Sequence, residues 1–177
     1  MNAVADTSAL RHIIVVGGTV ADWAALPADQ WTTLLGELGK VADATGASWL
    51  TVRPYEGSAG DESLERTAAV GQCLVSAHPQ SDGRARVAAA VAELQAEGQP
   101  ITEASIARHL NAPAGADPDL VVILGSSHRL PPSLVWELAY SELVFLDLNW
   151  SHLTAAHLEE AISTYARRNR RFGGVND

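Results

Sequence analysis

The sequence predicts an α/β protein with a mostly parallel central sheet of about five or six strands and helices on both faces. Short apolar runs that are typical of buried strands alternate with longer segments whose apolar residues recur at helical spacing. These short runs are continuously apolar rather than alternating, which indicates parallel strands covered on both sides. With 177 residues, of which 47% are hydrophobic, the chain is long enough for one compact domain with a core.

The first half of the chain is predicted to contain three strands and one long helix. The strand-like runs are HIIVV at 12–16, SWLTVR at 48–53 and QCLVSA at 72–77. Apolar residues at i, i+3, i+4 and i+7 predict a helix around residues 31–42, and Gly46 lies where a helix-terminating glycine belongs. We also expect a short helix within residues 62–70.

The second half repeats the alternation. The predicted strands are LVVIL at 120–124 and LVFLDL at 143–148. Four helices are expected: one from about Asp82 to Gly98, one capped by Thr102, one that begins at Pro131 and Pro132, and a last one over about residues 154–170.

The composition excludes several classes of partner. With 21 acidic and 12 basic residues, the net charge of −9 argues against binding to nucleic acid or to an anionic membrane surface. No apolar run is long enough to span a membrane, and the single cysteine, Cys73, cannot form an internal disulfide, so a cytoplasmic location is expected. Residues 1–11 lack the features of a signal peptide, and we expect them to be poorly ordered, before a single domain over residues 12–177.

No catalytic or metal-binding constellation of the chain's own is visible. The spacing of the six histidines does not match a metal site, and no nucleophile lies near a candidate base in the pattern. The basic residues instead gather at the C-terminus, where Arg167, Arg168, Arg170 and Arg171 are followed by Phe172, Gly173 and Gly174. Such a cluster is ordinarily a solvated helix end that complements the helix dipole, whereas arginine followed by glycine also suits a phosphate contact.

Three segments resemble the cis-prenyltransferase family, whose best-known members are undecaprenyl diphosphate synthases. They are HIIVVGGTVADWA at 12–24, DLVVILGSSHRLPPSLVWELAYSELVFLDLNW at 119–150 and the tail ARRNRRFGG at 166–174. In the family, the first strand ends in Asp-Gly-Asn-Gly-Arg-Trp, whose aspartate positions magnesium and the allylic diphosphate. Here Gly18 stands at the aspartate, Asp22 stands at the arginine, and only Trp23 is retained.

Further departures affect the rest of the implied active site. Ile123 replaces an arginine at the end of the fourth strand, while Arg129 and Glu142 are retained and are candidate helpers at a diphosphate or magnesium site. The stretch between the second and third predicted strands is much shorter than in catalytic members, where it supplies the helices around the product tunnel. The resemblance therefore implies a truncated domain whose own tunnel is shallow or absent.

This combination is similar to the accessory subunits of heteromeric cis-prenyltransferases. The resemblance implies a non-catalytic but required subunit, whose Arg171, Phe172, Gly173 and Gly174 act in trans on a diphosphate. The partner would be a full-length catalytic homologue that holds Mg²⁺ and condenses an allylic diphosphate with isopentenyl diphosphate or another small acceptor. Two alternatives remain: a self-sufficient short-chain prenyltransferase homodimer, and a pseudoenzyme that only binds another protein.

The same resemblance implies where the partner binds. In the family, the late strands and the helices beside them form the dimer interface, and this part of the chain is rich in apolar residues. The candidate interface residues are Leu134, Val135, Trp136, Leu138, Val144, Phe145 and Trp150. Some of them must also serve the core.

Overall fold

The structure, a computed structural model, contains one six-stranded sheet and confirms the predicted fold class. It describes residues 10–57, 61–125, 129–139 and 141–172, although only the backbone is described beyond Arg168. The strand order is β3-β4-β2-β1-β5-β6, and all pairs are parallel except β3 with β4. The strands are β1 (His12–Val16), β2 (Trp49–Arg53), β3 (Arg66–Val70), β4 (Cys73–Ala77), β5 (Leu120–Leu124) and β6 (Glu142–Leu146).

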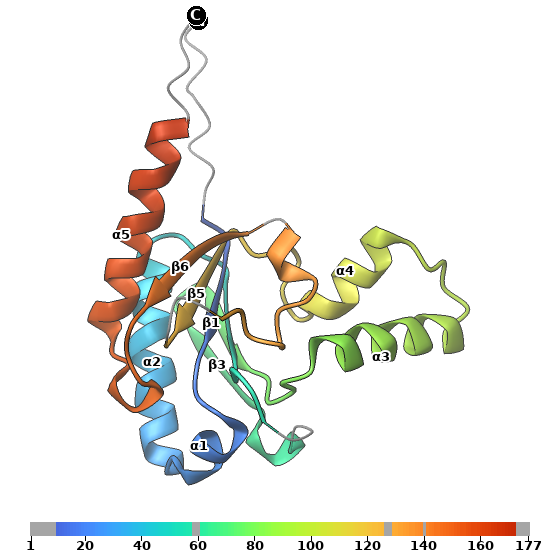
Figure 1. Cartoon of the computed structure of the whole chain (residues 1–177), viewed down its shortest axis with the longest axis horizontal. Coiled ribbons are helices and arrows are strands. Elements are labelled where there is room, and N and C mark those ends of the chain that lie inside the picture. The colour runs from blue at the N-terminus through green and yellow to red at the C-terminus, as the bar shows by residue number, and fades with distance from the viewer. Residues whose placement is uncertain (1–9, 58–60, 126–128, 140, 173–177) are drawn as a thin grey trace, which may run out of the picture.

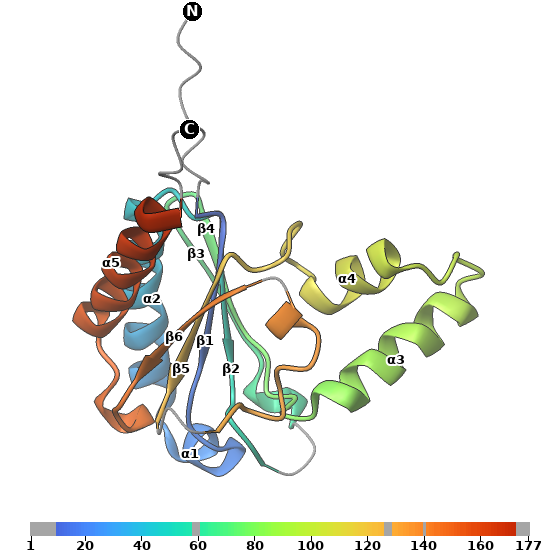
Figure 2. The same cartoon turned by 45° about the horizontal axis from the view of Figure 1, so that its top comes forward.

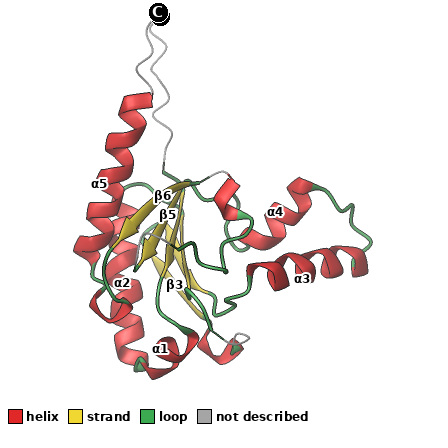
Figure 3. Ribbon diagram, in the orientation of Figure 1, coloured by secondary structure: helices red, strands yellow, loops and turns green. Residues whose placement is uncertain are grey.

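The helices lie on both sides of the sheet but differ in how they pack (Figures 1 and 2). The long helices α2 (Ala28–Ala44) and α5 (Ala155–Phe172) cover one face, and the short α1 (Val20–Ala25) lies at the edge where β1 ends. On the other side, α3 (Gly83–Ala96) and α4 (Glu103–Asn111) pack against each other and project away from the sheet. Figure 3 shows this α3–α4 arm beside the more compact strand layer.

Two apolar clusters stabilise the sheet, one on each face. The larger lies beneath α2 and α5 and contains buried side chains such as Val15, Leu38 and Leu158. The smaller contains Ile14, Val16, Val121, Ile123 and Leu134. Since strand side chains alternate between faces, β1 and β5 contribute to both clusters, which explains their continuously apolar sequences.

The predicted helix within residues 62–70 is wrong, because this segment forms a 3₁₀ turn at Glu62–Leu64 followed by the edge strand β3. A tight turn at Gly71 makes β3 antiparallel to β4. Gly71 has φ +58°, and its neighbour Gln72 donates its backbone N–H to Asp43 on α2 at 2.7 Å. The turn and its anchoring by α2, rather than helical spacing, therefore fix the conformation of this alanine-rich run.

The helix predicted from Pro131 is also wrong, since only a 3₁₀ turn at Glu137–Ala139 forms within residues 131–139. Helix α3 engages the backbone carbonyls that a helix here would need. Pro132 O accepts from Gly83 N at 3.0 Å, and Ser133 O accepts from Arg86 Nη1 at 3.0 Å. These tertiary contacts hold the segment across the second sheet face in a largely irregular conformation.

The described chain begins two residues before the expected domain boundary at residue 12. Leu10 is buried, and the backbone N–H groups of Arg11 and His12 donate to the Asp119 carboxylate at 2.7 and 3.0 Å. Residues 1–9 lie outside the described part of the chain. Among the helices that the structure describes, none combines the length and apolar character needed to span a membrane.

Candidate functional site

A cavity of about 680 Å³ opens at the edge of the sheet where β1, β2, β5 and β6 end. Parallel strands bring their carboxyl ends to one edge, which is where open α/β sheets ordinarily bind ligands. The lining residues come from the loops after these strands and from α1 and α2: Gly18, Thr19, Asp22, Ala25, Leu26, Pro27, Gln30, Tyr55, Glu56, Leu124, Gly125, Arg129, Leu148, Asn149, Trp150 and Ser151. We call this the first cavity.

Three tryptophans form the rigid support of the first cavity. The ring of Trp23 stacks on Trp150 with centroids 5.6 Å apart and meets Trp31 edge-on at 5.0 Å. Trp23 Nε1 donates to Gly17 O at 3.0 Å, and Trp31 Nε1 donates to Trp23 O at 3.1 Å. All three indoles are buried, and those of Trp23 and Trp31 have their polar atom satisfied, so this cluster fixes the position of the loop that follows β1.

Gly18 adopts a conformation that strongly favours glycine. Its φ is +71°, and a Cβ atom added there would lie 2.8 Å from Cγ of the buried Trp150. An aspartate at this position would therefore require both an unfavourable backbone conformation and a shift of the tryptophan cluster.

Asp22 is engaged by the chain itself. Its carboxylate accepts from the Thr19 backbone N–H at 2.7 Å and from the Thr19 hydroxyl at 2.8 Å, while Thr19 Oγ1 accepts from Asp22 N at 3.0 Å. This reciprocal arrangement is a capping box for α1. As a result, the Thr19 backbone N–H at the cavity is already occupied by the Asp22 carboxylate.

Arg129 also lies at the first cavity, where its charge is opposed by a carboxylate. Its Nη2 lies 3.6 Å from Glu56 Oε2, and both side chains are largely exposed. Tyr55 donates its hydroxyl to the Arg129 backbone carbonyl at 2.6 Å, which ties the loop after β2 to the loop after β5. Asp22, Glu56 and Arg129 give the described lining a formal charge of −1.

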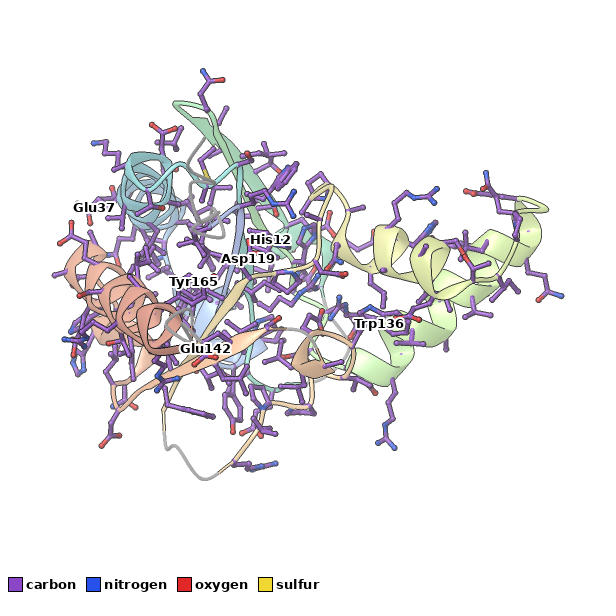
Figure 4. The ribbon with its side chains drawn as sticks, turned by 90° about the horizontal axis from the view of Figure 1, so that it is seen from above. His12, Glu37, Asp119, Trp136, Glu142 and Tyr165 are labelled. Carbon is purple, nitrogen blue, oxygen red and sulfur yellow. The ribbon has the colours of Figure 1, made fainter. Side chains whose placement is uncertain are left out.

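The other predicted site residues lie elsewhere. Ile123 is fully buried in the smaller apolar cluster rather than at the first cavity. Glu142, at the start of β6, pairs with Arg168 of α5 at 2.6 Å, and Arg168 also donates to Leu143 O at 2.7 Å. Figure 4 shows Glu142 beside α5. Because β6 runs toward the first cavity, its first residue lies at the opposite edge of the sheet.

The tail also lies at that opposite edge. Helix α5 begins near the carboxyl ends of the strands and runs past their amino ends (Figures 1 and 2). Its 18 residues span about 27 Å at the usual helical rise. Arg171 and Phe172 are its last residues, and Gly173 and Gly174 lie outside the described residues. The chain's own arginine-rich end is therefore far from its own first cavity.

The structure divides the candidate interface residues into two groups. Leu134, Val144 and Trp150 are buried within the chain and serve its core. Four others are wholly or partly exposed: Val135, Trp136, Leu138 and Phe145. Val135 has 47% of its surface exposed, and Trp136 lies near the base of the α3–α4 arm (Figure 4).

A second cavity, of about 340 Å³, escaped the sequence analysis. It lies between the end of β2, the segment after β4 and the α3–α4 arm, and its lining includes Arg53, His78 and Arg86. The pKa of His78 is lowered to about 4, mainly by burial and to a smaller extent by the nearby charge of Arg53. The pKa of Arg53 is lowered to about 9, mainly by burial and to a smaller extent by the charge of Arg86. The sequence did offer one signal for this cavity, because Arg53 is a charged residue at the end of the mostly apolar strand WLTVR.

The low pKa of His78 predicts a loss of stability in mild acid. An unfolded chain would protonate this histidine near its ordinary pKa of 6.5, whereas the folded chain resists protonation until about pH 4. The folded state thus binds fewer protons, and the free energy of unfolding should fall by about 2 kcal/mol between pH 6.5 and about 4.5. Urea denaturation across this range, compared with His78→Asn, isolates the contribution, and equal slopes in both proteins would contradict it.

The donor groups present do not form a metal centre. Among the described residues, no group of three or more His, Cys, Asp or Glu side chains is placed to hold a metal ion. At the first cavity, Gly18 offers no carboxylate, Asp22 is held by Thr19, and Glu56 faces Arg129. These residues therefore do not fit Mg²⁺, which prefers free carboxylate oxygens.

Comparisons with known proteins agree on one family. The family model described as "Putative undecaprenyl diphosphate synthase" matches residues 58–173. Isoprenyl transferase 2 of Bradyrhizobium diazoefficiens is 42% identical over 90 residues, which cover 51% of this chain and 36% of that protein. The trans,polycis-polyprenyl diphosphate synthase ((2Z,6E)-farnesyl diphosphate specific) of Thermobifida fusca is 30% identical over 159 residues, which cover 89% of this chain and 51% of that protein. The chain thus spans about a third to a half of these relatives.

Solved structures show the same fold at low sequence identity. A "probable undecaprenyl diphosphate synthase" from Campylobacter jejuni superposes with a TM-score of 0.60 and 16% identity, covering 95% of this chain and 98% of that one. Lavandulyl diphosphate synthase from Lavandula x intermedia, in complex with dimethylallyl diphosphate, gives a TM-score of 0.57 and 15% identity, covering 91% and 97% of the two chains. At these identities the likeness concerns the fold alone.

Proposed function

Since this chain belongs to the undecaprenyl diphosphate synthase family of cis-prenyltransferases, we propose that it is a non-catalytic but required subunit of a two-component cis-prenyltransferase. Its partner would be a full-length catalytic homologue in the same compartment, which we take to be the cytoplasm. That partner would transfer an allylic prenyl group to isopentenyl diphosphate or to another small acceptor. In this proposal, residues 12–177 act as one truncated domain with a functional tail.

The observation that supports a non-catalytic role is the charge at the first cavity. The family's arginine is replaced by Asp22, whose carboxylate already accepts the Thr19 N–H at 2.7 Å. At about 4 Å and an effective dielectric constant near 20, such a replacement turns roughly 4 kcal/mol of attraction for a phosphate charge into similar repulsion. The remaining arginine, Arg129, is opposed by Glu56. A diphosphate would therefore bind poorly in this chain's own cavity.

The short connection between β2 and β4 supports the same conclusion. The family resemblance implies that catalytic members have long helices between these two strands, around the product tunnel. In this chain, the described residues between Arg53 and Cys73 contain only a 3₁₀ turn and the edge strand β3. The helices that would enclose a long prenyl chain are thus missing from this part of the structure.

Magnesium is assigned to the partner for a related reason. Prenyltransferases of this family generally depend on Mg²⁺, which neutralises diphosphate charge when it is bound. The donors at this chain's first cavity do not fit the ion, because the family's aspartate position is Gly18 and the nearby carboxylates are engaged. The partner's own carboxylates would hold it.

The position of the tail supports action in trans. Arg171 lies at the end of α5, at the sheet edge opposite the first cavity. Gly173 and Gly174 follow Phe172 directly, and two residues extend at most about 7 Å, which is far less than the length of α5. We propose that Arg171, Phe172, Gly173 and Gly174 contact a diphosphate held mainly by the partner, while Arg129 and Glu142 are helpers at most.

The partner is proposed to bind the exposed part of the second sheet face. Val135, Trp136, Leu138 and Phe145 leave apolar surface there that α3 and α4 do not cover, because this arm projects outward. A stable pair ordinarily buries about 800 Å² on each partner. We therefore include the adjoining α3–α4 arm in the proposed interface.

The purified chain alone should not form polyprenyl diphosphates. Incubation with Mg²⁺, farnesyl diphosphate and isopentenyl diphosphate should give no product above a control without protein. Gly18→Asp should not restore activity, because its Cβ would lie 2.8 Å from Trp150 and Asp22 would remain. A catalytic homologue that co-purifies with the chain serves as the positive control.

Each outcome separates the proposed role from its alternatives. Product formed by the purified chain would instead indicate a self-sufficient homodimeric enzyme. Co-purification with a homologue whose turnover is unchanged by this chain would instead indicate a protein-binding pseudoenzyme. Only a homologue that requires this chain for turnover is consistent with the proposed subunit role.

A further inference from the structure

A buried cluster of charged groups lies beside the second cavity, which shares no lining residue with the first cavity. Arg53, at the end of β2, is only 4% exposed. Arg86, on α3, pairs with the buried Glu137 at 2.8 Å. Both arginines donate an Nη2 hydrogen bond to the backbone carbonyl of Leu110, at 3.3 Å from Arg53 and 3.1 Å from Arg86.

The charges in this cluster do not balance. Arg53 and Arg86 contribute two positive charges and Glu137 one negative charge, while burial keeps the neighbouring His78 neutral at physiological pH by lowering its pKa. The buried cluster is therefore left with one net positive charge. Burying a charge without a counter-charge is strongly unfavourable, so native proteins pair such groups with an ion or a ligand.

Two polar atoms in the same place also lack a partner. Within the described residues, Arg53 Nε and His78 Nε2 are buried and make no hydrogen bond. Both residues line the second cavity, whose volume of about 340 Å³ suits a small molecule. Water could accept hydrogen bonds from these atoms but would leave the buried positive charge uncompensated.

We propose that the second cavity binds the carboxylate group of a small zwitterionic molecule, with Arg53 Nε and His78 Nε2 as hydrogen-bond donors. One carboxylate supplies the single negative charge that the cluster lacks, and guanidinium groups bind carboxylates with favourable geometry. His78 donates from Nε2 when its neutral ring carries the proton there. This inference is independent of the proposed subunit role, because it concerns a different cavity.

The rim of the cavity selects the ligand class. Three exposed carboxylates, Glu62, Glu65 and Glu93, line the cavity, and Glu93 is paired with His109. They repel phosphate and diphosphate, which carry more than one negative charge on average at neutral pH, and they attract a ligand with an ammonium group at its other end. An amino acid with separated charges has this pattern, whereas a prenyl diphosphate carries several negative charges and no ammonium group.

Nuclear magnetic resonance of the full chain, labelled with ¹⁵N in its histidine rings, tests this inference. β-Alanine and propionate are matched probes, because they share a carbon skeleton and differ in the ammonium group. Both should shift the His78 Nε2 resonance in a saturable manner, with β-alanine binding at least threefold more tightly at low salt. Inorganic phosphate should cause no saturable shift.

Variants complete the test by calorimetric titration with β-alanine. Arg53→Gln should weaken binding at least tenfold, and His78→Leu, which removes only the second donor, should weaken it severalfold. Arg84→Gln is the matched control, because Arg84 lies on the same helix as Arg86 but does not line the cavity. If Arg53→Gln does not fold, His78→Leu alone decides. Saturable binding of phosphate alone, no binding of either carboxylate, or unchanged affinity in the cavity variants would overturn the inference.

Discussion

Trp23→Ala is expected to lower the free energy of unfolding by about 4 kcal/mol, because it removes the centre of the tryptophan cluster. Trp23 is fully buried, stacks on Trp150 with centroids 5.6 Å apart and contacts Trp31 at 5.0 Å. The variant would leave a large cavity beneath the loop after β1. It would also leave the Gly17 carbonyl without the Trp23 Nε1 donor.

Equilibrium unfolding in urea measures this effect, and Trp49→Ala is the matched control. Trp49 is also an indole but is only partly buried, at the start of β2. Its replacement should cost less than half as much. Such a large loss matters, because domains of this size are stable by only about 5–15 kcal/mol. A loss below about 1 kcal/mol for Trp23→Ala, or equal losses for both variants, would show that the cluster is not a rigid support.

The parts of the fold that were predictable from sequence are those whose conformation follows from local pattern. The runs at 12–16 and 120–124 are strands at those bounds, because both faces of these central strands are buried. The segment at 131–139 could not be predicted, since the carbonyls of Pro132 and Ser133 are engaged by α3, far away in sequence. Edge strand β3 was missed because its conformation depends on the Gly71 turn and on Asp43 of α2.

In the candidate site, too, the contacts between residues from different segments could not be predicted from the sequence. Gly18, Asp22 and Arg129 were identified through the resemblance, and the structure brings all three to the first cavity. What the sequence did not reveal is that Asp22 is held by Thr19 and that Arg129 faces Glu56. The buried cluster at the second cavity was not found at all. Its residues are separated by long stretches of chain, and their spacing matches no recognised motif.

Arg171→Ala should reduce the turnover of the reconstituted two-subunit complex at least tenfold while leaving assembly intact. This prediction depends on the proposed role of the tail in trans. A charge-assisted contact between a guanidinium group and phosphate is worth roughly 1.5–3 kcal/mol, which corresponds to one to two decades in rate when it is felt in the transition state. Gly173→Ala should have nearly the same effect if its backbone approaches the phosphate.

Arg167→Ala is the matched control for the tail. Arg167 lies one turn earlier on the same helix and donates Nη2 to Thr164 Oγ1 on its own helix at 2.9 Å. Its removal changes the net charge by the same amount as Arg171→Ala, so a general electrostatic effect of the tail would affect both variants equally. The measurement is a steady-state assay of each mixed complex, with gel filtration to confirm that the subunits assemble.

The comparison between these two arginines decides what the end of α5 does. Since the chain's own first cavity lies at the other edge of the sheet, loss of turnover with Arg171→Ala but intact assembly would indicate a contact with a site that another chain supplies. Equal and small effects of both variants would mean that the tail is a solvated helix end, whose cations complement the helix dipole. Loss of assembly with Arg171→Ala would instead make the tail part of the interface. Either result would refute the mechanism in which this acidic domain gathers its positive charge at one end to bind a partner-held diphosphate.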